Sequence, residues 1–429
     1  MRDVPDRAES CSVPVSLPDL VVRSRRIVLT DGTRPAAVFI REGTIVGIRD
    51  FDDVPSGCQL DDVGADVVMP GVVDTHVHVN EPGRTEWEGF ETATRAAAAS
   101  GVTTIIDMPL NSIPSTTSVS ALEAKRRAAE GKCFVDVGFW GGVVPGNASE
   151  LPALHAAGVF GFKCFLVPSG VDEFRCESEA DLRAAMPTIA TLGAPLLVHA
   201  ELPGPINTAV AQVTGRDPRR YETYLATRPR EAESQAIALM VDLCRELGTR
   251  THIVHLSSSD ALTMLSNARA TGLAITVETC PHYLSVAAEE IADGATSFKC
   301  APPIRERENR ERLWTALSEG LIDMVVTDHS PSPPALKHGE SGDFLRAWGG
   351  ISSLQVSLPA TWTEASARSH SLSQLAEWMC HAPARLAGLD RKGAIETGRD
   401  ADLVIWNPDA ELTVDAKSLH HRHPITPYH

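Results

Sequence analysis

The fold is decided by residues 71–78, GVVDTHVH, an apolar run that ends in two histidines. Seven further apolar runs follow it, and stretches of helical period such as GFETATRAAAAS (89–100) separate most of them. Apolar strands that alternate with helices are typical of parallel βα units. Eight units over about 280 residues predict an α/β fold, a (β/α)8 TIM-like barrel. Its expected strands are 71–78, 102–109, 133–140, 159–166, 194–201, 250–257, 273–280 and 322–329.

The chain on either side of these units has a different character. It begins with short β segments separated by turns such as Asp31-Gly32, and residues 392–414, KGAIETGRDADLVIWNPDAELTV, return to that style. We therefore expect a small β-sandwich domain that both chain ends form together. The expected division is a flexible N-terminal extension over 1–18, the first part of the β domain over 19–69, the barrel over 70–386, and a short second part of the β domain over 387–429.

Composition narrows the class of function. The 429 residues include 39 Lys and Arg against 56 Asp and Glu, which gives a net charge of −17 and argues against nucleic acid or an anionic membrane as a partner. No apolar run approaches the ~18 residues of a membrane span, and the charged start MRDVPDRAES does not look like a signal peptide. The nine cysteines show no C-x-x-C spacing, so we expect a reducing compartment and a cytoplasmic protein.

Residues of the types that bind metals stand at the ends of five expected strands. In a barrel these ends face the active site. Residues i and i+2 of a strand share one face, so His76 and His78 can point at one ion. The candidate ligands are His76, His78, Lys163, His199, His255 and Asp328.

Each candidate has an ordinary explanation when taken alone. A lone H-x-H occurs by chance, His199 or His255 can be a hydrogen-bonded core histidine, and Asp328 can cap a helix. Lys163 can lie at a strand edge or form a Schiff base. The coincidence on five strands nevertheless favours a metal site.

Four imidazoles and one carboxylate suit zinc or a similar divalent ion. Two ions about 3.5–4 Å apart need a bridging ligand, and none of the strand-end residues is a glutamate placed to bridge. Addition of CO2 to the Lys163 amine would give a carbamate with two oxygens and one negative charge. That modification would explain a lysine among metal ligands.

The motifs taken together resemble the cyclic amidohydrolases of the amidohydrolase superfamily. The resemblance covers nearly the whole chain from about residue 20. It rests on MPGVVDTHVHVNEPGRTEWEGFETATRAAAASGVTT (69–104), GFKCFL (161–166), VHAE (198–201), HIVHLSS (252–258), ETCPHYL (278–284), VTDHSP (326–331) and KGAIETGRDADLVIW (392–406).

The resemblance implies a role for each candidate ligand. His76 and His78 would bind a buried metal ion, and His199 and His255 a more exposed one, with zinc expected and cobalt, nickel or manganese as alternatives. Lys163 would be N6-carboxylysine, formed with CO2, and would bridge the two ions. Asp328 would complete the first metal's ligands and act as the catalytic proton carrier. A hydroxide bridging the ions would attack the amide carbon of a cyclic substrate.

Finer motifs point to a substrate. Dihydroorotases of this family carry an arginine at the position of Asn80 and read DHAPH where this chain has DHSPS (328–332). The runs NEPGR (80–84), DMPLN (107–111) and WGGI (348–351) instead resemble allantoinases. That resemblance implies opening of the hydantoin ring of allantoin to allantoate in purine (ureide) catabolism. A hydantoinase or dihydropyrimidinase is the alternative, and a dihydroorotase a weaker one.

Several residues are candidate substrate contacts by the same resemblance. They are Asn111, Cys280 through its main chain, Ser330 and Gly350. Asn111 can equally be a turn residue, Ser330 a helix cap and Gly350 part of a plain loop. His282 and His329 are expected to support the site from behind the ligands.

The resemblance also implies a small cyclic amide as partner and a homotetramer or dimer as assembly. Two other classes of protein stay open. One is a non-catalytic scaffold with this fold, which the six intact ligand positions disfavour. The other is a metal-free lyase that forms a Schiff base through Lys163, which would leave four convergent histidines without a purpose.

Overall fold

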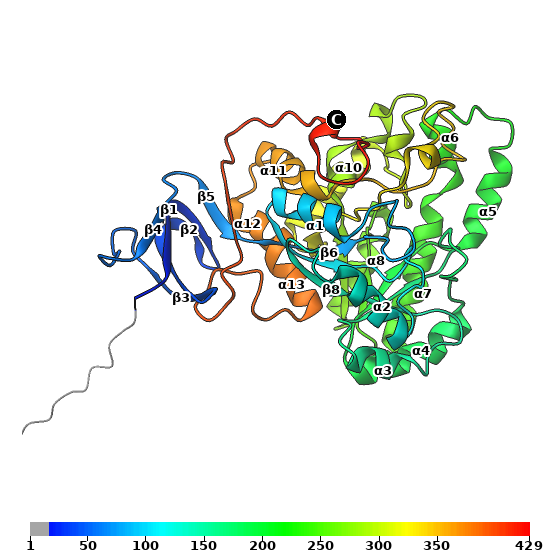
Figure 1. Ribbon diagram of the computed structural model, residues 1–429. Helices are drawn as coiled ribbons and strands as arrows, with labels where there is room; N and C mark the ends of the chain where they lie inside the picture. Colours follow the sequence, from blue (N-terminus) through cyan, green and yellow to red (C-terminus); the bar gives the residue numbers. More distant parts are fainter. Residues whose placement is uncertain (1–16) are drawn as a thin grey trace, which may run out of the picture.

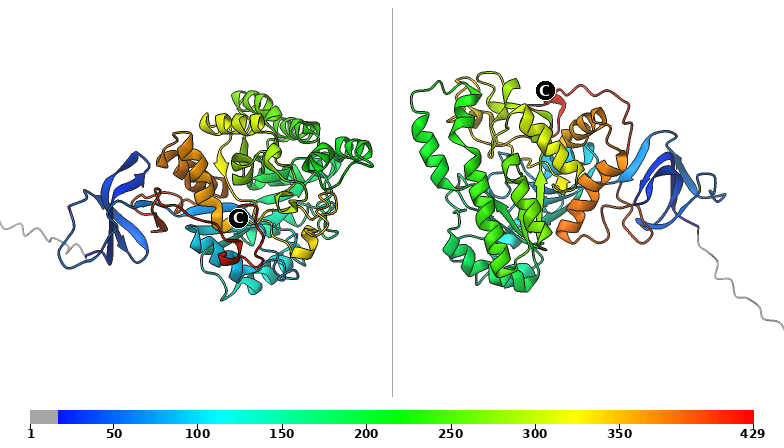
Figure 2. Two further views of the ribbon diagram at one scale, coloured as in Figure 1. Left: turned by 90° about the horizontal axis from the view of Figure 1, so that it is seen from above. Right: turned by 180° about the vertical axis from the view of Figure 1, so that it is seen from behind.

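The computed structural model describes residues 17–429 as a barrel with a small sheet at one side (Figure 1). In two further views the small sheet again lies to one side of the barrel (Figure 2). The expected N-terminal extension over 1–18 lies outside the described residues except for its last two positions.

The barrel strands follow the eight expected apolar runs. They are β6 (Val72–Val77), β7 (Val102–Asp107), β8 (Asp136–Phe139) continued after Trp140 by β9 (Gly141–Gly142), β10 (Phe162–Phe165), β11 (Leu196–His199), β12 (Thr251–Ile253), β13 (Ile275–Thr279) and β14 (Met324–Val325). They pair in parallel as β6-β7-β8 and as β9-β10-β11-β12-β13-β14. The ring closes where Val77 bridges His329 and the His78 N–H donates to the His329 carbonyl at 2.8 Å. The expected barrel is thus confirmed.

Helices surround the strands, and their ends follow ordinary capping rules. Helix α4 begins with a capping box between Ser178 and Asp181 and ends at Gly193 in the left-handed conformation. Helix α7 turns Ala236, Ile237 and Met240 into the core. The helices are α1 (Phe90–Ala99), α2 (Val119–Ala129), α3 (Leu151–Ala156), α4 (Glu179–Leu192), α5 (Pro203–Gln212), α6 (Tyr221–Thr227), α7 (Arg230–Leu247), α8 (Leu262–Ala270), α9 (Pro281–Ser285), α10 (Arg307–Ser318), α11 (Ser357–Ala367), α12 (Leu372–Ala376) and α13 (Ala382–Ala387).

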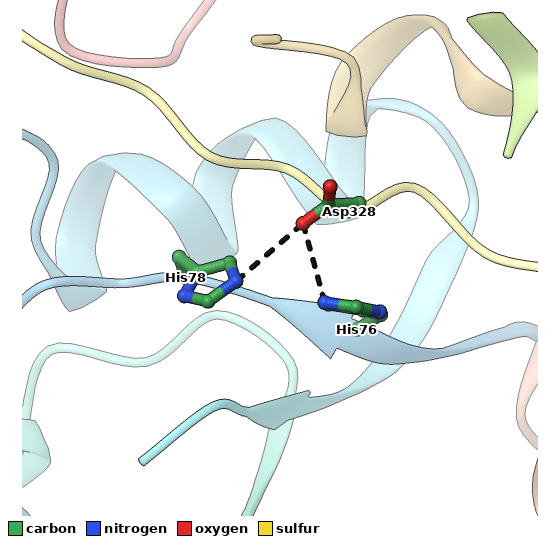
Figure 3. A group of neighbouring side chains, drawn as sticks. All are labelled: His76, His78 and Asp328. Carbon is green, nitrogen blue, oxygen red and sulfur yellow. Dashed lines mark ion pairs between the residues drawn. The ribbon is translucent and has the colours of Figure 1, made fainter. Parts of the chain in front are cut away.

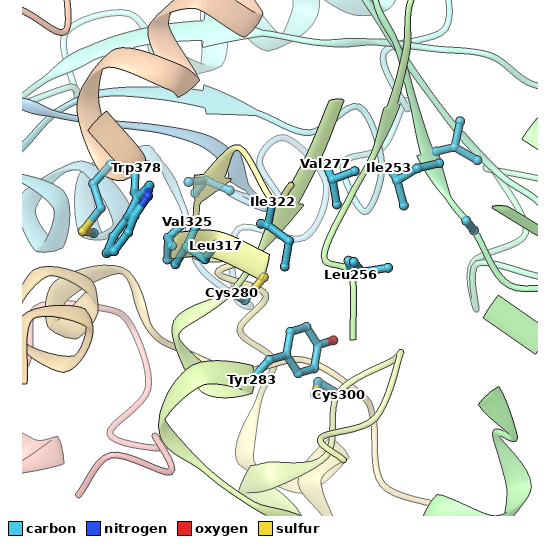
Figure 4. Close-up of a cluster of buried hydrophobic side chains, with 14 of the residues drawn as sticks. Ile253, Leu256, Val277, Cys280, Tyr283, Cys300, Leu317, Ile322, Val325 and Trp378 are labelled. Atoms are coloured by element: carbon cyan, nitrogen blue, oxygen red, sulfur yellow. The ribbon is translucent and has the colours of Figure 1, made fainter. Parts of the chain in front are cut away.

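The main core lies between the barrel strands and these helices. Ile253 on β12 and Val277 on β13 are buried with Leu317 of α10 and with Trp378 (Figure 4). Burial on both faces explains why the barrel strands read as continuous apolar runs rather than as alternating ones. No helix within residues 17–429 is long and apolar enough to cross a membrane.

The small sheet has six strands from both ends of the chain. Its order is β15-β5-β1-β2-β3, with β4 paired to β1. The strand β15 lies antiparallel to β5, so the C-terminal region completes a sheet that the N-terminal region begins. The strands are β1 (Leu20–Leu29), β2 (Gly32–Arg41), β3 (Thr44–Arg49), β4 (Gln59–Asp62), β5 (Val67–Pro70) and β15 (Leu403–Trp406). The second layer of a sandwich stays a prediction.

The end of the chain lies against the barrel. After β15 the chain returns to the barrel, as the red segment of Figure 1 shows. The Arg422 N–H donates to Glu88 at 3.1 Å, and the Thr426 hydroxyl donates to the Ser352 carbonyl at 2.7 Å. The last residues therefore contact the barrel next to the loops that carry the candidate site.

Candidate metal centre and active site

Three of the predicted ligands form a compact group at the C-terminal end of the barrel (Figure 3). His76 lies on β6, His78 directly follows that strand, and Asp328 follows β14. One Asp328 carboxylate oxygen lies 3.2 Å from His76 Nε2 and 3.4 Å from His78 Nε2. One ligand atom from each residue lies within 4.8 Å of the others, so the group can hold a metal ion.

The other three predicted ligands lie beside this group. The ring centroids of His199, at the end of β11, and His255, just past β12, are 4.6 Å apart. The His255 ring lies 5.4 Å from the His76 ring, which joins the two sets. Lys163 on β10 is fully buried, with its amine 5.2 Å from the Phe165 ring centroid, and that ring stacks on His199. The six residues predicted from the sequence thus come from five strands and meet at one end of the barrel.

Glu278 on β13 orients His76 of the first group. One of its oxygens pairs with His76 Nδ1 and also accepts the His255 main-chain N–H at 3.2 Å. Its other oxygen lies 2.8 Å from His252 Nε2. The contact on Nδ1 leaves His76 Nε2 directed toward Asp328, which is how a buried carboxylate fixes the orientation of a ligand histidine.

Glu201, itself paired with Arg228, orients the His199 ring in the same way. A Glu201 oxygen lies 2.8 Å from His199 Nε2 and also pairs with the Arg228 guanidinium. Burial favours the neutral form of Glu201, but Arg228 and His199 outweigh it and lower its pKa to about 2. Because Nε2 is taken, His199 has Nδ1 left for a ligand.

At neutral pH the side chains of His78, His255 and Asp328 are in the protonation states that bind cations. Burial lowers the pKa of His78 to about 4 and holds that of His255 well below its usual value. Burial opposes ionisation of Asp328, but His76 and His78 lower its pKa to about 2. Metals bind neutral imidazole and ionised carboxylate, so the donor set fits a divalent ion.

Lys163 fits the group only if something changes at its amine. Burial lowers its pKa to about 8. The amine accepts or donates no hydrogen bond within residues 17–429, and the same holds for His255 Nδ1. A buried polar nitrogen without a partner is costly, which marks these atoms as sites for a group that the polypeptide itself does not supply.

The backbone is also unusual where two ligands are presented. His255 has φ of 39° and Asp328 has φ of 45°, both in the left-handed region. A non-glycine residue held there costs on the order of 1–3 kcal/mol, and such residues cluster at functional sites. The turn at each strand end thus aims the side chain at the common centre.

A cavity of about 770 Å³ opens above the ligands. Its lining includes the four histidines and Asp328, and also the predicted contacts Asn111, Ser330 and Gly350. Cys280 is fully buried and does not line the cavity. Asn111 has φ of 66°, so the turn interpretation of this residue holds alongside its place at the cavity.

The expected supporting histidines differ from each other. His329 turns away from the cavity, with Nε2 3.3 Å from Glu88 and Nδ1 accepting the Ser353 N–H at 3.1 Å. His282 is buried, and neither of its ring nitrogens has a partner within residues 17–429. Neither histidine lines the cavity.

Sequence reasoning missed Glu201, Arg228, His252 and Glu278. Glu201 and Glu278 stand inside the motifs VHAE and ETCPHYL, so their place near strand ends was visible. Glu201 is only two residues from His199, but Arg228 and His76, the partners of Glu201 and Glu278, come from distant parts of the chain, and only the folded barrel brings them together.

The comparison with families agrees with this geometry. A family model described as "Amidohydrolase family" matches residues 67–425, which is most of the chain. The chain therefore belongs to the amidohydrolase family.

Individual relatives show which members of the amidohydrolase family this chain resembles. The allantoinase of Streptomyces avermitilis is 55% identical, over 96% of this chain and 91% of that protein. The allantoinase of Arabidopsis thaliana is 45% identical, over 94% of this chain and 82% of that protein. The solved structure of the L-hydantoinase (dihydropyrimidinase) from Arthrobacter aurescens superposes with a TM-score of 0.90 at 33% identity, over 96% of this chain and 92% of that one. The resemblance to allantoinases predicted from the motifs is thus confirmed.

Proposed function

We propose that this protein is a metal-dependent cyclic amidohydrolase that opens the hydantoin ring of allantoin to give allantoate, a step of purine (ureide) catabolism. The observation that carries the proposal is the buried His76, His78 and Asp328 group at the floor of a cavity, in a chain 55% identical to an allantoinase. Its location in the cytoplasm, its homotetrameric assembly and the division of the chain at residues 69 and 386 stay predictions of the sequence.

In this proposal the six residues hold two divalent ions, for which zinc is the first choice. His76, His78 and Asp328 would hold one ion, His199 and His255 the other, and Lys163 would bridge them after reaction with CO2. Ions held in this way polarise an amide carbonyl and make water nucleophilic at neutral pH.

Asp328 is the proposed proton carrier. Hydrolysis forms a C–O bond between water and the ring carbonyl carbon, breaks the ring C–N bond and delivers one proton to the leaving nitrogen. Asp328 lines the cavity, and its pKa of about 2 keeps it ionised and able to accept that proton from water.

The cavity wall supplies the proposed contacts to the ring. Asn111 carries an amide, Ser330 a hydroxyl, and Gly350 exposes main-chain atoms, and all three line the cavity. Such groups match the alternating N–H and C=O groups of a hydantoin ring and of a ureido side chain. A main-chain contact from Cys280 stays a prediction of the resemblance, because the whole residue is buried and does not line the cavity.

A hydantoinase or dihydropyrimidinase is the second candidate function. It is favoured by the TM-score of 0.90 to the L-hydantoinase structure. The mechanism and the ligands would be the same, and the cavity wall would decide the substrate.

One experiment tests the proposal. Purified protein reconstituted with zinc or cobalt is given allantoin, hydantoin, dihydrouracil or dihydroorotate, and ring opening is followed with and without a chelator. We expect allantoin to be the preferred substrate and the chelator to stop its turnover. Preference for hydantoin or dihydrouracil would overturn the substrate but keep the chemistry. Turnover that survives complete metal removal would overturn the mechanism.

A further inference from the structure

One wall of the cavity is a stretch of chain without helix or strand. Residues 345–350, here called the wall segment, all line the cavity. The segment lies between the buried residues Phe344 and Ile351, and Ile351 bridges His329. Irregular backbone has buried carbonyls that no ladder satisfies, so its position depends on other donors.

Two lysines from other parts of the chain supply these donors. The Lys299 amine donates to the carbonyls of Ala347 at 2.5 Å and Leu345 at 3.3 Å. The Lys337 amine donates to the carbonyls of Trp348, at 3.1 Å, and Gly350. Four carbonyls of a six-residue stretch are therefore held by two ammonium groups.

Lys337 is the more unusual of the two. It ends a short 3-10 helix, Pro334–Lys337, and is only 5% exposed. It forms no ion pair with any carboxylate within residues 17–429, so the wall carbonyls are its hydrogen-bond acceptors. Burial lowers its pKa to about 7. Burying an ammonium group costs free energy unless hydrogen bonds compensate for it, and the wall carbonyls supply those hydrogen bonds.

The wall segment also touches the loop that follows Asp328. Gly350 has φ of 128°, and a Cβ atom there would lie 2.2 Å from the Ser330 carbonyl oxygen. The Ser330 N–H donates to the Ile351 carbonyl at 3.0 Å. A shift of the wall would therefore change the space beside Ser330, two residues beyond Asp328.

At its other side the wall presents Trp348. Its ring meets Trp87 edge to face at 5.1 Å, and a Cβ atom added to Gly170 would lie 3.0 Å from it. Since Lys337 binds the carbonyls of both Trp348 and Gly350, one amine holds the second half of the wall segment.

We propose that Lys337 is a positioning residue that sets the width of the substrate cavity by holding the wall segment, and that it thereby determines which ring substituents the site accepts. The inference rests on the proposed function, because the substituent in question is the ureido group that distinguishes allantoin from hydantoin. Lys337 contacts neither the candidate metal ligands nor the reacting atoms of the substrate. It acts through the carbonyls of Trp348 and Gly350.

The test compares Lys337→Met, which keeps the length of the side chain and removes the donors, with the parent protein. Lys392→Met is the matched control, because Lys392 is partly buried and ion-paired with Asp136 at 2.6 Å but contacts no part of the wall segment. For each protein, kcat and KM for allantoin, KM or Ki for hydantoin, and bound zinc are measured.

In Lys337→Met we expect KM for allantoin to rise at least about tenfold while KM or Ki for hydantoin changes less than about threefold. Bound zinc and kcat should stay close to the parent values, and Lys392→Met should shift neither constant. An unchanged ratio of the two constants in a folded Lys337→Met protein would overturn the inference.

If Lys337→Met does not accumulate as folded protein, Lys299→Met provides the second test. Lys299 is partly exposed, holds the same segment and also lines the cavity itself, so we expect a selective rise of KM for allantoin that is smaller than in Lys337→Met. An equal change of the constants for allantoin and for hydantoin would again overturn the inference. Failure of the parent protein to open allantoin would instead refute the proposed function, so the two failures are distinguishable.

Discussion

In one half of the candidate metal centre, His76 and His78 share the carboxylate of Asp328, and in the other, His199 and His255 face the lysine at 163. The first half has its ligand atoms within 4.8 Å of each other. The second has its two rings 4.6 Å apart and a buried amine without a hydrogen-bond partner within residues 17–429. The halves therefore have the same imidazole donors and different charges.

The difference in charge shows that the second half lacks an anionic metal ligand. Imidazole nitrogens and an ionised carboxylate attract a divalent cation, whereas an ammonium group repels it. Reaction of the Lys163 amine with CO2 would replace that positive charge by a negative one. We infer that the first half is ready for a metal as it folds, and that the second becomes ready when Lys163 is modified.

The largest effect is expected for Lys163→Ala, which removes the bridge. Turnover should fall by at least about 10⁴-fold, because the second ion has lost its anionic ligand. Bound metal, measured by elemental analysis, should fall below that of the parent protein, and short carboxylic acids should restore part of the activity. Lys392→Met serves as the control for loss of a partly buried lysine. Full activity of Lys163→Ala would refute the carbamate.

Asp328→Asn is expected to have the next largest effect. The amide keeps the shape of the side chain but cannot accept the proton, so kcat should fall roughly 10²–10⁴-fold. Much of the metal should stay bound, because His76 and His78 remain. A variant with the parent rate would remove Asp328 from the mechanism.

Glu201→Gln and Glu278→Gln separate the two halves. Loss of an orienting carboxylate weakens metal binding by about 10–100-fold. Glu201→Gln should therefore weaken the site of His199, and Glu278→Gln the site of His76, as measured by competition with a chelator of known affinity. Identical metal-binding curves for the two variants would contradict the division into halves.

Recovery of the stripped protein should depend on pH. The neutral amine of Lys163 reacts with CO2, and its fraction increases as pH rises through its pKa of about 8. Reactivation with zinc and CO2 should therefore be roughly twentyfold faster at pH 8.5 than at pH 6.5, at constant dissolved CO2. His78 and Asp328 should be in their metal-binding forms at both values, since the pKa of His78 is about 4 and that of Asp328 about 2. A rate that does not change with pH would argue against the amine as the reacting group.

The strands and the six candidate ligands could be predicted from the sequence because both depend on local pattern. Continuous apolar runs identify buried parallel strands, and a polar residue at the end of such a run faces the active site. His76 and His78 are two residues apart, so their common direction follows from strand geometry alone.

The contacts of Glu278 and the Glu201–Arg228 pair could not be predicted, because they join residues that are far apart in the sequence. Glu278 reaches His76 across 202 residues of chain. Arg422 reaches Glu88 across 334, in a segment whose local pattern indicated the small β domain. No local signal specifies such pairings, and the role of Lys337 depends in the same way on a loop that only the folded barrel places.

The most direct measurement follows allantoin ring opening while zinc is added to chelator-stripped protein, with and without bicarbonate. The account predicts that turnover with bicarbonate reaches its plateau at two zinc ions per chain. Without bicarbonate, one ion should bind tightly and turnover should stay low. Full turnover at one ion per chain, or a full return of activity without any CO2, would contradict a two-ion site that carboxylated Lys163 completes.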